Sequence, residues 1–399
     1  MTGYEHVTDD IVWIGGSDRR LSRFENIFPL PKGVSYNSYV VLDDEIALFD
    51  TADISISDQY LENLRCLLGE RTPSYLVILH MEPDHCSQIA TVAGLYPGLK
   101  LVASAQAFKM LHQFFPELDS MEHVTMAEGG TLKTGRHTFY FVTAPMVHWP
   151  EVLMAYDDVS GGLFSADAFG TFGATDTALW ADELDFEREY LSEARRYYAN
   201  IVGKYGPQVQ AVLKKAQSLD IKALYPLHGP LWRKPEGIAW FLDKYQKWST
   251  YEPEDDGYVV IYGSLYGHTE SAAAQCARLL RQKSGRDVRL YDVSGTDVSD
   301  LIGEVWRCRN IVLFGPTYNN GLYPPMAAFL HDCQALAVQN RRFSLAENGT
   351  WAPAAGKLMR EAIECLKGCE ITQPLLTIRS ALHEADSARL EEFVDAIVR

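Results

Sequence analysis

The chain has 399 residues, more than a single hydrophobic core usually spans, so two domains are expected. Hydrophobic residues make up 47% and charged residues 22%, enough for packed cores in a soluble, globular protein. The formal charge of −17 repels phosphate backbones and anionic lipid headgroups, which argues against nucleic acid and membrane surfaces as partners.

The first residues, MTGYEHVTDDIVWIGG, include acids and lack a basic cluster followed by an apolar stretch, so they do not resemble a secretion signal. No run of about 18 or more apolar residues occurs, and no membrane span is expected. The seven cysteines are odd in number and scattered, as expected of reduced thiols. Without paired CxxC motifs, neither a zinc ribbon nor a fused rubredoxin module is expected. We predict a cytoplasmic protein.

Strands mixed with helices are expected in the first half of the chain. The segment VSYNSYVVLDDEIALFDTAD, residues 34–53, reads as a β-hairpin with its turn at residues 42–45. Further strands are expected at SYLVILH (74–80), LKLVASA (99–105) and HTFYFVTAPM (137–146). This mixture predicts an α/β or α+β sandwich rather than a helical domain.

The segment KWSTYEPEDDG, residues 247–257, has the composition of an exposed linker between domains. Beyond it, apolar strands alternate with helical segments, which predicts a parallel, doubly wound sheet. We therefore expect one domain at residues 1–250 and a second at residues 251–399. The expected strands are 258–263, 288–293, 310–315, 342–348 and 375–380, and the expected helices are 271–283, 324–336 and 354–367.

The strongest chemical signal in the first domain is HMEPDH, at the end of the strand predicted at 74–80. Such a cluster of ligand-type side chains is costly to bury unpaired, which indicates a positive ion among them; a polar turn with capping residues is the simpler alternative. Three more ligand-type residues each follow a β-like stretch, and together the set suits two metal ions. The candidate ligands are His80, Glu82, Asp84, His85, His148, Asp167 and His228.

In the second domain, strand 258–263 runs through SLYGHTES directly into a helix. Glycine and hydroxyl groups at a helix start can cradle a phosphate, although a plain helix cap would look similar. No lysine marks a triphosphate loop and no GxGxxG marks a dinucleotide site. Two further loops, GPTYNNGLYPP and ENGTWAPAAGK, fall at the carboxyl edge of the sheet, where doubly wound folds bind ligands. The candidate contacts are Ser264, Leu265, Tyr266, Gly267, His268, Thr269, Pro316, Thr317, Tyr318, Asn319, Asn320, Gly321, Asn348, Gly349, Thr350 and Trp351.

On these motifs the whole chain resembles the flavodiiron proteins, also called A-type flavoproteins. The order of the ligand segments is similar to a metallo-β-lactamase domain, but Glu82 stands where zinc hydrolases of that fold carry histidine. A carboxylate in that place suits iron better than zinc. The resemblance implies an N-terminal metallo-β-lactamase-like αββα sandwich, followed by a flavodoxin-like doubly wound parallel sheet that binds FMN.

The resemblance also implies the roles of individual residues. His80, Glu82 and His148 would bind one iron, Asp84 and His228 the other, and Asp167 would bridge the two. The histidine at the place of His85 is a ligand in some family members and not in others, so its role stays open. Trp149 would lie between the iron site and a flavin and shield or couple them. His85, Trp149 and Asp167 are thus the candidates for a direct part in catalysis.

The implied activity is the reduction of dioxygen to water, of nitric oxide to nitrous oxide, or of both. Electrons would come from rubredoxin, another small redox protein or a reduced deazaflavin, and would pass through FMN to the di-iron site. Family members bring flavin and iron together by head-to-tail assembly, which implies a homodimer or homotetramer. Two alternatives stay open: a metal-dependent hydrolase fused to a flavodoxin, and a non-catalytic flavin electron carrier.

Overall fold

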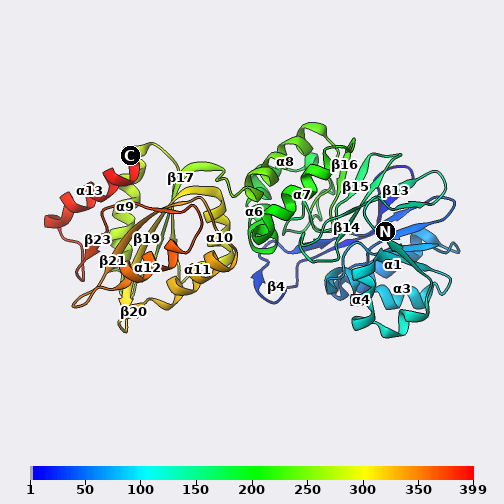
Figure 1. The fold of residues 1–399 in the computed structure, drawn as a ribbon, viewed down its shortest axis with the longest axis horizontal. Helices are drawn as coiled ribbons and strands as arrows, with labels where there is room; N and C mark the ends of the chain where they lie inside the picture. Colours follow the sequence, from blue (N-terminus) through cyan, green and yellow to red (C-terminus); the bar gives the residue numbers. More distant parts are fainter. Residues whose placement is uncertain (1–2) are drawn as a thin grey trace. The chain divides into compact units, whose positions relative to one another are not determined.

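The computed structural model describes residues 3–399, which form two compact units. The first unit contains most of the chain up to Gln246, and the second contains Lys247–Arg399. A short segment, Tyr198–Lys204, belongs to the second unit although it interrupts the first in sequence. Figure 1 shows the helices and strands of both units. No helix within residues 3–399 is long and apolar enough to cross a bilayer.

The larger sheet of the first unit has the strand order β1-β2-β7-β8-β9-β10-β11. Its strands are β1 Glu5–His6, β2 Ile11–Trp13, β7 Tyr39–Val41, β8 Ala47–Phe49, β9 Tyr75–Val77, β10 Lys100–Ser104 and β11 His123–Met126. The antiparallel pair β7 and β8 confirms the predicted hairpin, with Tyr39 opposite Phe49. Its helices are α1 Ser57–Leu68, α3 Ile89–Leu95 and α4 Ala105–Phe114.

A second sheet, with the order β12-β13-β14-β15-β16, packs against the first. Its strands are β12 Thr131–Lys133, β13 Thr138–Thr143, β14 Leu153–Asp157, β15 Gly162–Phe164 and β16 Ala223–Tyr225. Aromatic rings join the two layers: the Phe49 ring stacks on that of Phe164 with centroids 4.2 Å apart and lies 4.9 Å from that of Phe139. Helices α5 Phe186–Glu189, α6 Leu191–Tyr197, α7 Gly206–Ala216 and α8 Pro235–Ser249 follow β15 and β16 in this half of the chain.

Two small antiparallel pairs and one short helix lie among the loops of the first unit. β3 Gly16–Asp18 pairs with β6 Val34–Tyr36, and β4 Arg23–Phe24 pairs with β5 Phe28–Pro29. The helix α2, Pro83–Cys86, is the next element after β9 and carries part of the HMEPDH motif.

The second unit contains the predicted parallel sheet, with the order β18-β17-β19-β21-β22 and β23 beside β21. When the short strand β20, which pairs only with β19, is left out of the count, the strands run 2-1-3-4-5 in chain order, the flavodoxin-like order. The strands are β17 Asp255–Tyr262, β18 Val288–Asp292, β19 Cys308–Tyr318, β20 Gly321–Leu322, β21 Arg342–Asn348, β22 Glu370–Ile371 and β23 Leu376–Ile378. The helices are α9 His268–Ser284, α10 Val298–Arg307, α11 Pro324–Ala335, α12 Ala355–Glu364 and α13 Ser387–Val398.

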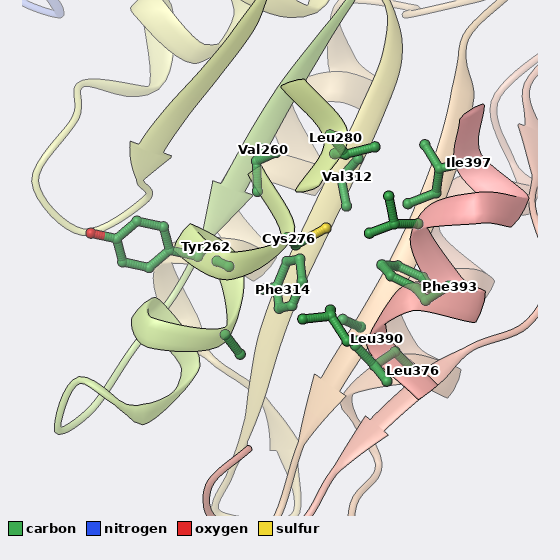
Figure 2. Packing of buried hydrophobic residues seen from close by; sticks show 14 of the residues in the cluster. Val260, Tyr262, Cys276, Leu280, Val312, Phe314, Leu376, Leu390, Phe393 and Ile397 are labelled. Atoms are coloured by element: carbon green, nitrogen blue, oxygen red, sulfur yellow. The ribbon is translucent and has the colours of Figure 1, made fainter. Parts of the chain in front are cut away.

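One hydrophobic core of this unit lies between the sheet and the helices α9 and α13, as Figure 2 shows. Cys276 and Leu280 of α9 and Phe393 of α13 meet Val312 and Phe314 of β19, and all five are at most 1% exposed. Burying such a side chain contributes about 1.5–3 kcal/mol, so this contact fixes α9, whose first turn carries the predicted phosphate loop.

The segment predicted to be an exposed linker is largely anchored, and that interpretation was wrong. Helix α8 continues to Ser249, and Asp255 already pairs with Cys308 as the start of β17. Tyr251 is 7% exposed, and its carbonyl accepts a hydrogen bond from the Arg341 guanidinium at 2.8 Å. The acids and the proline suggested a segment exposed to solvent, but the aromatic residues between them pack into the second unit.

Candidate metal centre and flavin pocket

The seven candidate metal ligands lie in loops or a short helix that follow strands of the first unit. β9 ends at Val77, earlier than predicted, because the Asp50 carboxylate takes over as acceptor for the next peptide groups. Its Oδ1 accepts the backbone N–H of Leu79 at 2.8 Å and of His80 at 3.2 Å. This turns the chain out of the sheet, so that His80 and Glu82 point toward the ligands that follow β13, β15 and β16.

One group of ligands consists of His80, Glu82, His148 and one oxygen of Asp167, all buried. Nε2 of His148 lies 3.0 Å from Glu82 Oε2 and 3.0 Å from Asp167 Oδ2. Nε2 of His80 lies 3.3 Å from Glu82 Oε2 and 3.5 Å from Asp167 Oδ2. Four donor atoms thus converge on one point.

The second group consists of Asp84, His85 and His228. The Nε2 atoms of His85 and His228 are 3.0 Å apart, and they lie 3.3 Å and 3.2 Å from Asp84 Oδ2. The other oxygen of Asp167, Oδ1, is 3.1 Å from Nε2 of His85. Asp167 therefore presents one oxygen to each group, and the structure brings His85 together with the second group.

These separations fit metal ions. Ligand atoms at ~2.1 Å from a metal and at right angles to each other lie ~3.0 Å apart, close to the separations found here. Both carboxylate oxygens of Asp84 and Oδ1 of Asp167 are buried and have no hydrogen-bond donor among residues 3–399. Because a buried, unpaired carboxylate costs several kcal/mol, the geometry and the donor set both fit a pair of cations.

Two groups that the sequence did not single out hold the ligands in place. Nδ1 of His80 lies 2.8 Å from Glu151 Oε1, which also accepts the backbone N–H of Met81 at 2.9 Å. Nδ1 of His228 lies 2.8 Å from the carbonyl oxygen of Ser35, which can only accept, so Nδ1 must carry the proton. In both histidines Nε2 is thereby left to bind a metal. Glu151 is the last residue of the segment APMVHWPE, and its closeness in sequence to the candidate ligand His148 could have suggested a role at the metal site.

Opposite charges dominate the pKa values at this site. Burial disfavours the charged imidazoles, but nearby carboxylates outweigh it: Asp84 and Asp167 raise the pKa of His85 to about 9, and Asp167 and Glu82 raise the pKa of His148 to about 9. The pKa of His80 is raised as well, chiefly by Asp167 and Glu151 against burial. Metal binding at neutral pH must therefore release protons from these imidazoles.

Aromatic side chains surround the second group. The rings of Phe24, Tyr36 and Tyr197 lie 5.4, 5.6 and 5.7 Å from the ring of His228. The Tyr197 hydroxyl is buried and has no hydrogen-bond partner among the described residues. Burial and the nearby Asp167 raise the pKa of Tyr197, so the hydroxyl stays a hydrogen-bond donor at neutral pH.

Two other residues lie at the first group. Trp149 is half-buried, with its ring edge-on to that of His80 at 5.4 Å. Glu25, in the turn between β4 and β5, was not predicted as a site residue; its side chain is exposed, and the charges of Glu82, His148 and Asp84 act on it. Partial burial and the Glu82 charge raise the pKa of Glu25 to about 8.

The predicted phosphate loop lies between β17 and α9. Helix α9 begins at His268, and Gly267 before it has φ +90°, in the left-handed region that favours glycine. The Ser264 hydroxyl accepts the Gly267 N–H at 3.0 Å and closes the turn. The Asn348 amide donates to the Thr269 hydroxyl at 3.1 Å, so the third loop supports the first.

A cavity of about 550 Å³ opens at this edge of the sheet. Every predicted flavin contact lines it except Gly267, which shapes the loop, and Gly321. Ala352 and Ser380 line it in addition; Ser380 ends a predicted strand at the same edge, which could have suggested it. Tyr266 and Trp351 are 92% and 81% exposed at its rim. Hydroxyl and amide groups below exposed aromatic rings suit a phosphate joined to a flat ring system such as FMN.

Comparison with known proteins finds the same two parts. Residues 34–229 match the model of the ODP family beta lactamase, and residues 260–391 match that of flavodoxin. A nitric oxide reductase of Moorella thermoacetica is 27% identical over 97% of this chain and 96% of its own length. An anaerobic nitric oxide reductase flavorubredoxin of Aeromonas hydrophila is 29% identical over 88% of this chain and 70% of its own.

Solved structures share the fold over almost the whole chain. The rubredoxin oxygen:oxidoreductase of Desulfovibrio gigas has a TM-score of 0.92, with 24% identity over 99% of this chain and 98% of that one. The flavodiiron protein of Giardia intestinalis has a TM-score of 0.90, with 23% identity over 99% and 96%. The ODP-type domain followed by flavodoxin, together with these relatives, shows that the chain belongs to the flavodiiron proteins.

Proposed function

We propose that this flavodiiron protein is an oxidoreductase that takes electrons from an external donor through FMN to a di-iron site and there reduces dioxygen to water, nitric oxide to nitrous oxide, or both. The observation that carries the proposal is Asp167, whose two oxygens face two convergent groups of ligands within one chain that also carries a flavodoxin pocket. The names of its relatives, which mention nitric oxide and oxygen, support the choice of substrates.

In this proposal His80, Glu82 and His148 would hold one iron, Asp84, His85 and His228 would hold the other, and Asp167 would offer one oxygen to each. When bound, the iron pair supplies electrons and open coordination positions for a small gas. Glu82 fits this role because a carboxylate in place of an imidazole favours iron over zinc.

The surrounding side chains keep the site dry and supply a donor. The rings about His228 exclude water, which strengthens electrostatic interactions within the site. The Tyr197 hydroxyl, buried and without a partner among the described residues, would be free to donate a hydrogen bond to a bound gas or its reduced products. Trp149 packs on His80 and would shield that ligand from solvent.

The second domain would hold FMN with the loops at residues 264–269, 316–321 and 348–351. When bound, the flavin accepts a hydride or single electrons and passes electrons on singly. The backbone at the start of α9 and the Ser264 and Thr269 hydroxyls would bind the phosphate. Tyr266 and Trp351 would cover the ring system.

Several finer statements belong to the same proposal. The donor would be rubredoxin, another small redox protein or a reduced deazaflavin, and the chains would assemble head to tail as a homodimer or homotetramer. The domains would meet near residues 250 and 251. All seven cysteines are free, which supports a reducing compartment, the cytoplasm.

The test is anaerobic reduction of protein loaded with iron and FMN, followed by electrode recordings of dioxygen and nitric oxide. We expect rapid consumption of at least one gas by the wild type and none by Asp167→Ala, while Glu128→Gln, changed at the surface, behaves as the wild type. Loss of neither gas at full cofactor loading would contradict the proposal and favour an electron carrier. Thioester hydrolysis by the zinc-loaded protein would instead favour a hydrolase.

A further inference from the structure

A buried carboxylate lies behind the third flavin loop, residues 348–351. Glu347 is in β21, one residue before Asn348, which lines the flavin cavity. In the parallel register it stands opposite Thr377 of β23. One residue along a strand spans about 3.3 Å, so the Glu347 side chain begins directly behind the wall of the cavity. Glu347 is 6% exposed, and its charge is therefore held away from solvent.

Both oxygens of this carboxylate accept hydrogen bonds. Oε2 accepts the backbone N–H of Gly356 at 2.8 Å, in the first turn of α12. Oε1 accepts the Thr377 hydroxyl at 2.9 Å. The positive end of the helix dipole at the start of α12 suits an anion in this place. The side chain is thus fixed in one position, with its charge at the flavin edge of the sheet.

No cation balances this charge. Among residues 3–399 Glu347 has no ion-pair partner, and both of its hydrogen-bond donors are uncharged. The residues that line the cavity include no lysine, arginine or carboxylate; His268 is the lining residue closest to a cation in character. Arg379, beside the lining residue Ser380, is exposed, so solvent screens its charge. A buried charge is screened much less, and Glu347 should dominate the field from this side.

Reduction places additional electrons on a bound flavin, and a fixed negative charge nearby opposes them. We propose that Glu347 sets the potential of the flavin: its carboxylate disfavours reduced FMN relative to oxidised FMN. The two electrons that FMN takes from the external donor are then passed more readily to the di-iron site. The inference rests on the proposed path of electrons through FMN.

The test measures the reduction potential of FMN bound to the full chain, by anaerobic titration against a reference dye of known potential. Glu347→Gln removes the charge at nearly constant shape, and its amide oxygen can still accept the Gly356 N–H. Leu375→Lys is a second change that leaves Glu347 in place. A Cβ built on Gly356 would lie 2.8 Å from Cδ2 of Leu375 and 3.0 Å from Oε2 of Glu347, so the two side chains meet there. Leu375 is partly exposed, and a lysine in its place can pair with the carboxylate.

Two controls separate charge from structure. Glu364→Gln makes the same chemical change at the exposed far end of α12. Thr377→Val removes the hydroxyl that donates to Glu347 but keeps the charge. All variants are first shown to be folded by circular dichroism and to bind FMN by fluorescence titration.

We expect Glu347→Gln to bind reduced FMN about tenfold more tightly relative to oxidised FMN, which raises the potential of the two-electron couple by about 30 mV. Leu375→Lys should also raise it, whereas Glu364→Gln and Thr377→Val should keep the wild-type potential. An unchanged potential in Glu347→Gln would overturn the inference. An equal rise in Thr377→Val would do the same, since loop geometry would then set the potential.

If Glu347→Gln binds no FMN, Leu375→Lys decides alone, and an unchanged potential in that variant overturns the inference. These outcomes leave the flavin site itself intact. A wild type that binds no FMN would instead contradict the proposed electron path, and the inference would fail with it.

Discussion

Replacement of Glu151 by glutamine tests how strongly an outer carboxylate supports the metal site. Glu151 lies behind His80, with its side chain fully buried, and makes no contact with the place of the metal. It accepts from Nδ1 of His80 at 2.8 Å and from the Met81 N–H at 2.9 Å. Glu151→Gln keeps the shape and one acceptor oxygen but removes the charge.

The size of the effect follows from these two bonds. A hydrogen bond to a charged group contributes about 1.5–3 kcal/mol, and a neutral one contributes about 1 kcal/mol. The variant should therefore lose roughly 1–2 kcal/mol of the free energy that holds His80 in its metal-binding orientation. That loss corresponds to a metal affinity weaker by roughly 5- to 30-fold. Glu151 also raises the pKa of His80, so its removal lessens competition from protons. The loss of metal affinity in Glu151→Gln should therefore be smaller at pH 7 than at higher pH, where the wild type and the variant both bind metal without displacing a proton.

The assay is chelator competition with Fe²⁺ or Co²⁺ at two pH values, on protein shown to be folded by circular dichroism. Glu128→Gln removes a surface carboxylate that pairs with Lys215 and should bind metal as the wild type does. An affinity of folded Glu151→Gln within about twofold of the wild type at both pH values would refute the assigned role of this carboxylate.

Three further changes address other parts of the chain. Tyr197→Phe should retain both metals but slow gas reduction about tenfold or more, as measured by electrode, because it removes the unpartnered hydroxyl beside the site; equal rates would rule out a hydrogen-bond role. Gly267→Ala should lower the free energy of unfolding by about 1 kcal/mol, because φ is +90°, a conformation that alanine disfavours. An added Cβ would meet no neighbouring atom, so the cost comes from the backbone alone. The same change should weaken FMN binding in a fluorescence titration. Asp43→Asn should lower stability by less than about 1 kcal/mol, since the residue is only partly buried and solvent screens its charge. Burial opposes its ionisation, but the N–H groups of His137 and Arg136 hold its pKa at about 2, below the unfolded value, so the stabilisation is present above pH 4 and is lost as pH falls toward 2. Chemical unfolding at pH 7 and pH 2.5 should show a smaller difference at the lower pH.

The metal ligands could be predicted from sequence because their chemistry is specific and each follows an apolar strand. HMEPDH and the later His148, Asp167 and His228 need partners once buried, and the structure brings all of them together. The flavin loops could be predicted for a similar reason, since strand order alone places them at one edge of the sheet.

The supporting residues could not be predicted in the same way. Glu151 reaches His80 only because the chain reverses after β13, and nothing in its neighbours fixes that geometry. Helix α10 was not predicted either, although Asp297 caps its first turn by accepting the Ser299 N–H at 3.0 Å. The acidic residues of segment 247–257 led to the wrong prediction of an exposed linker, because Trp248 and Tyr251 in the same segment are buried.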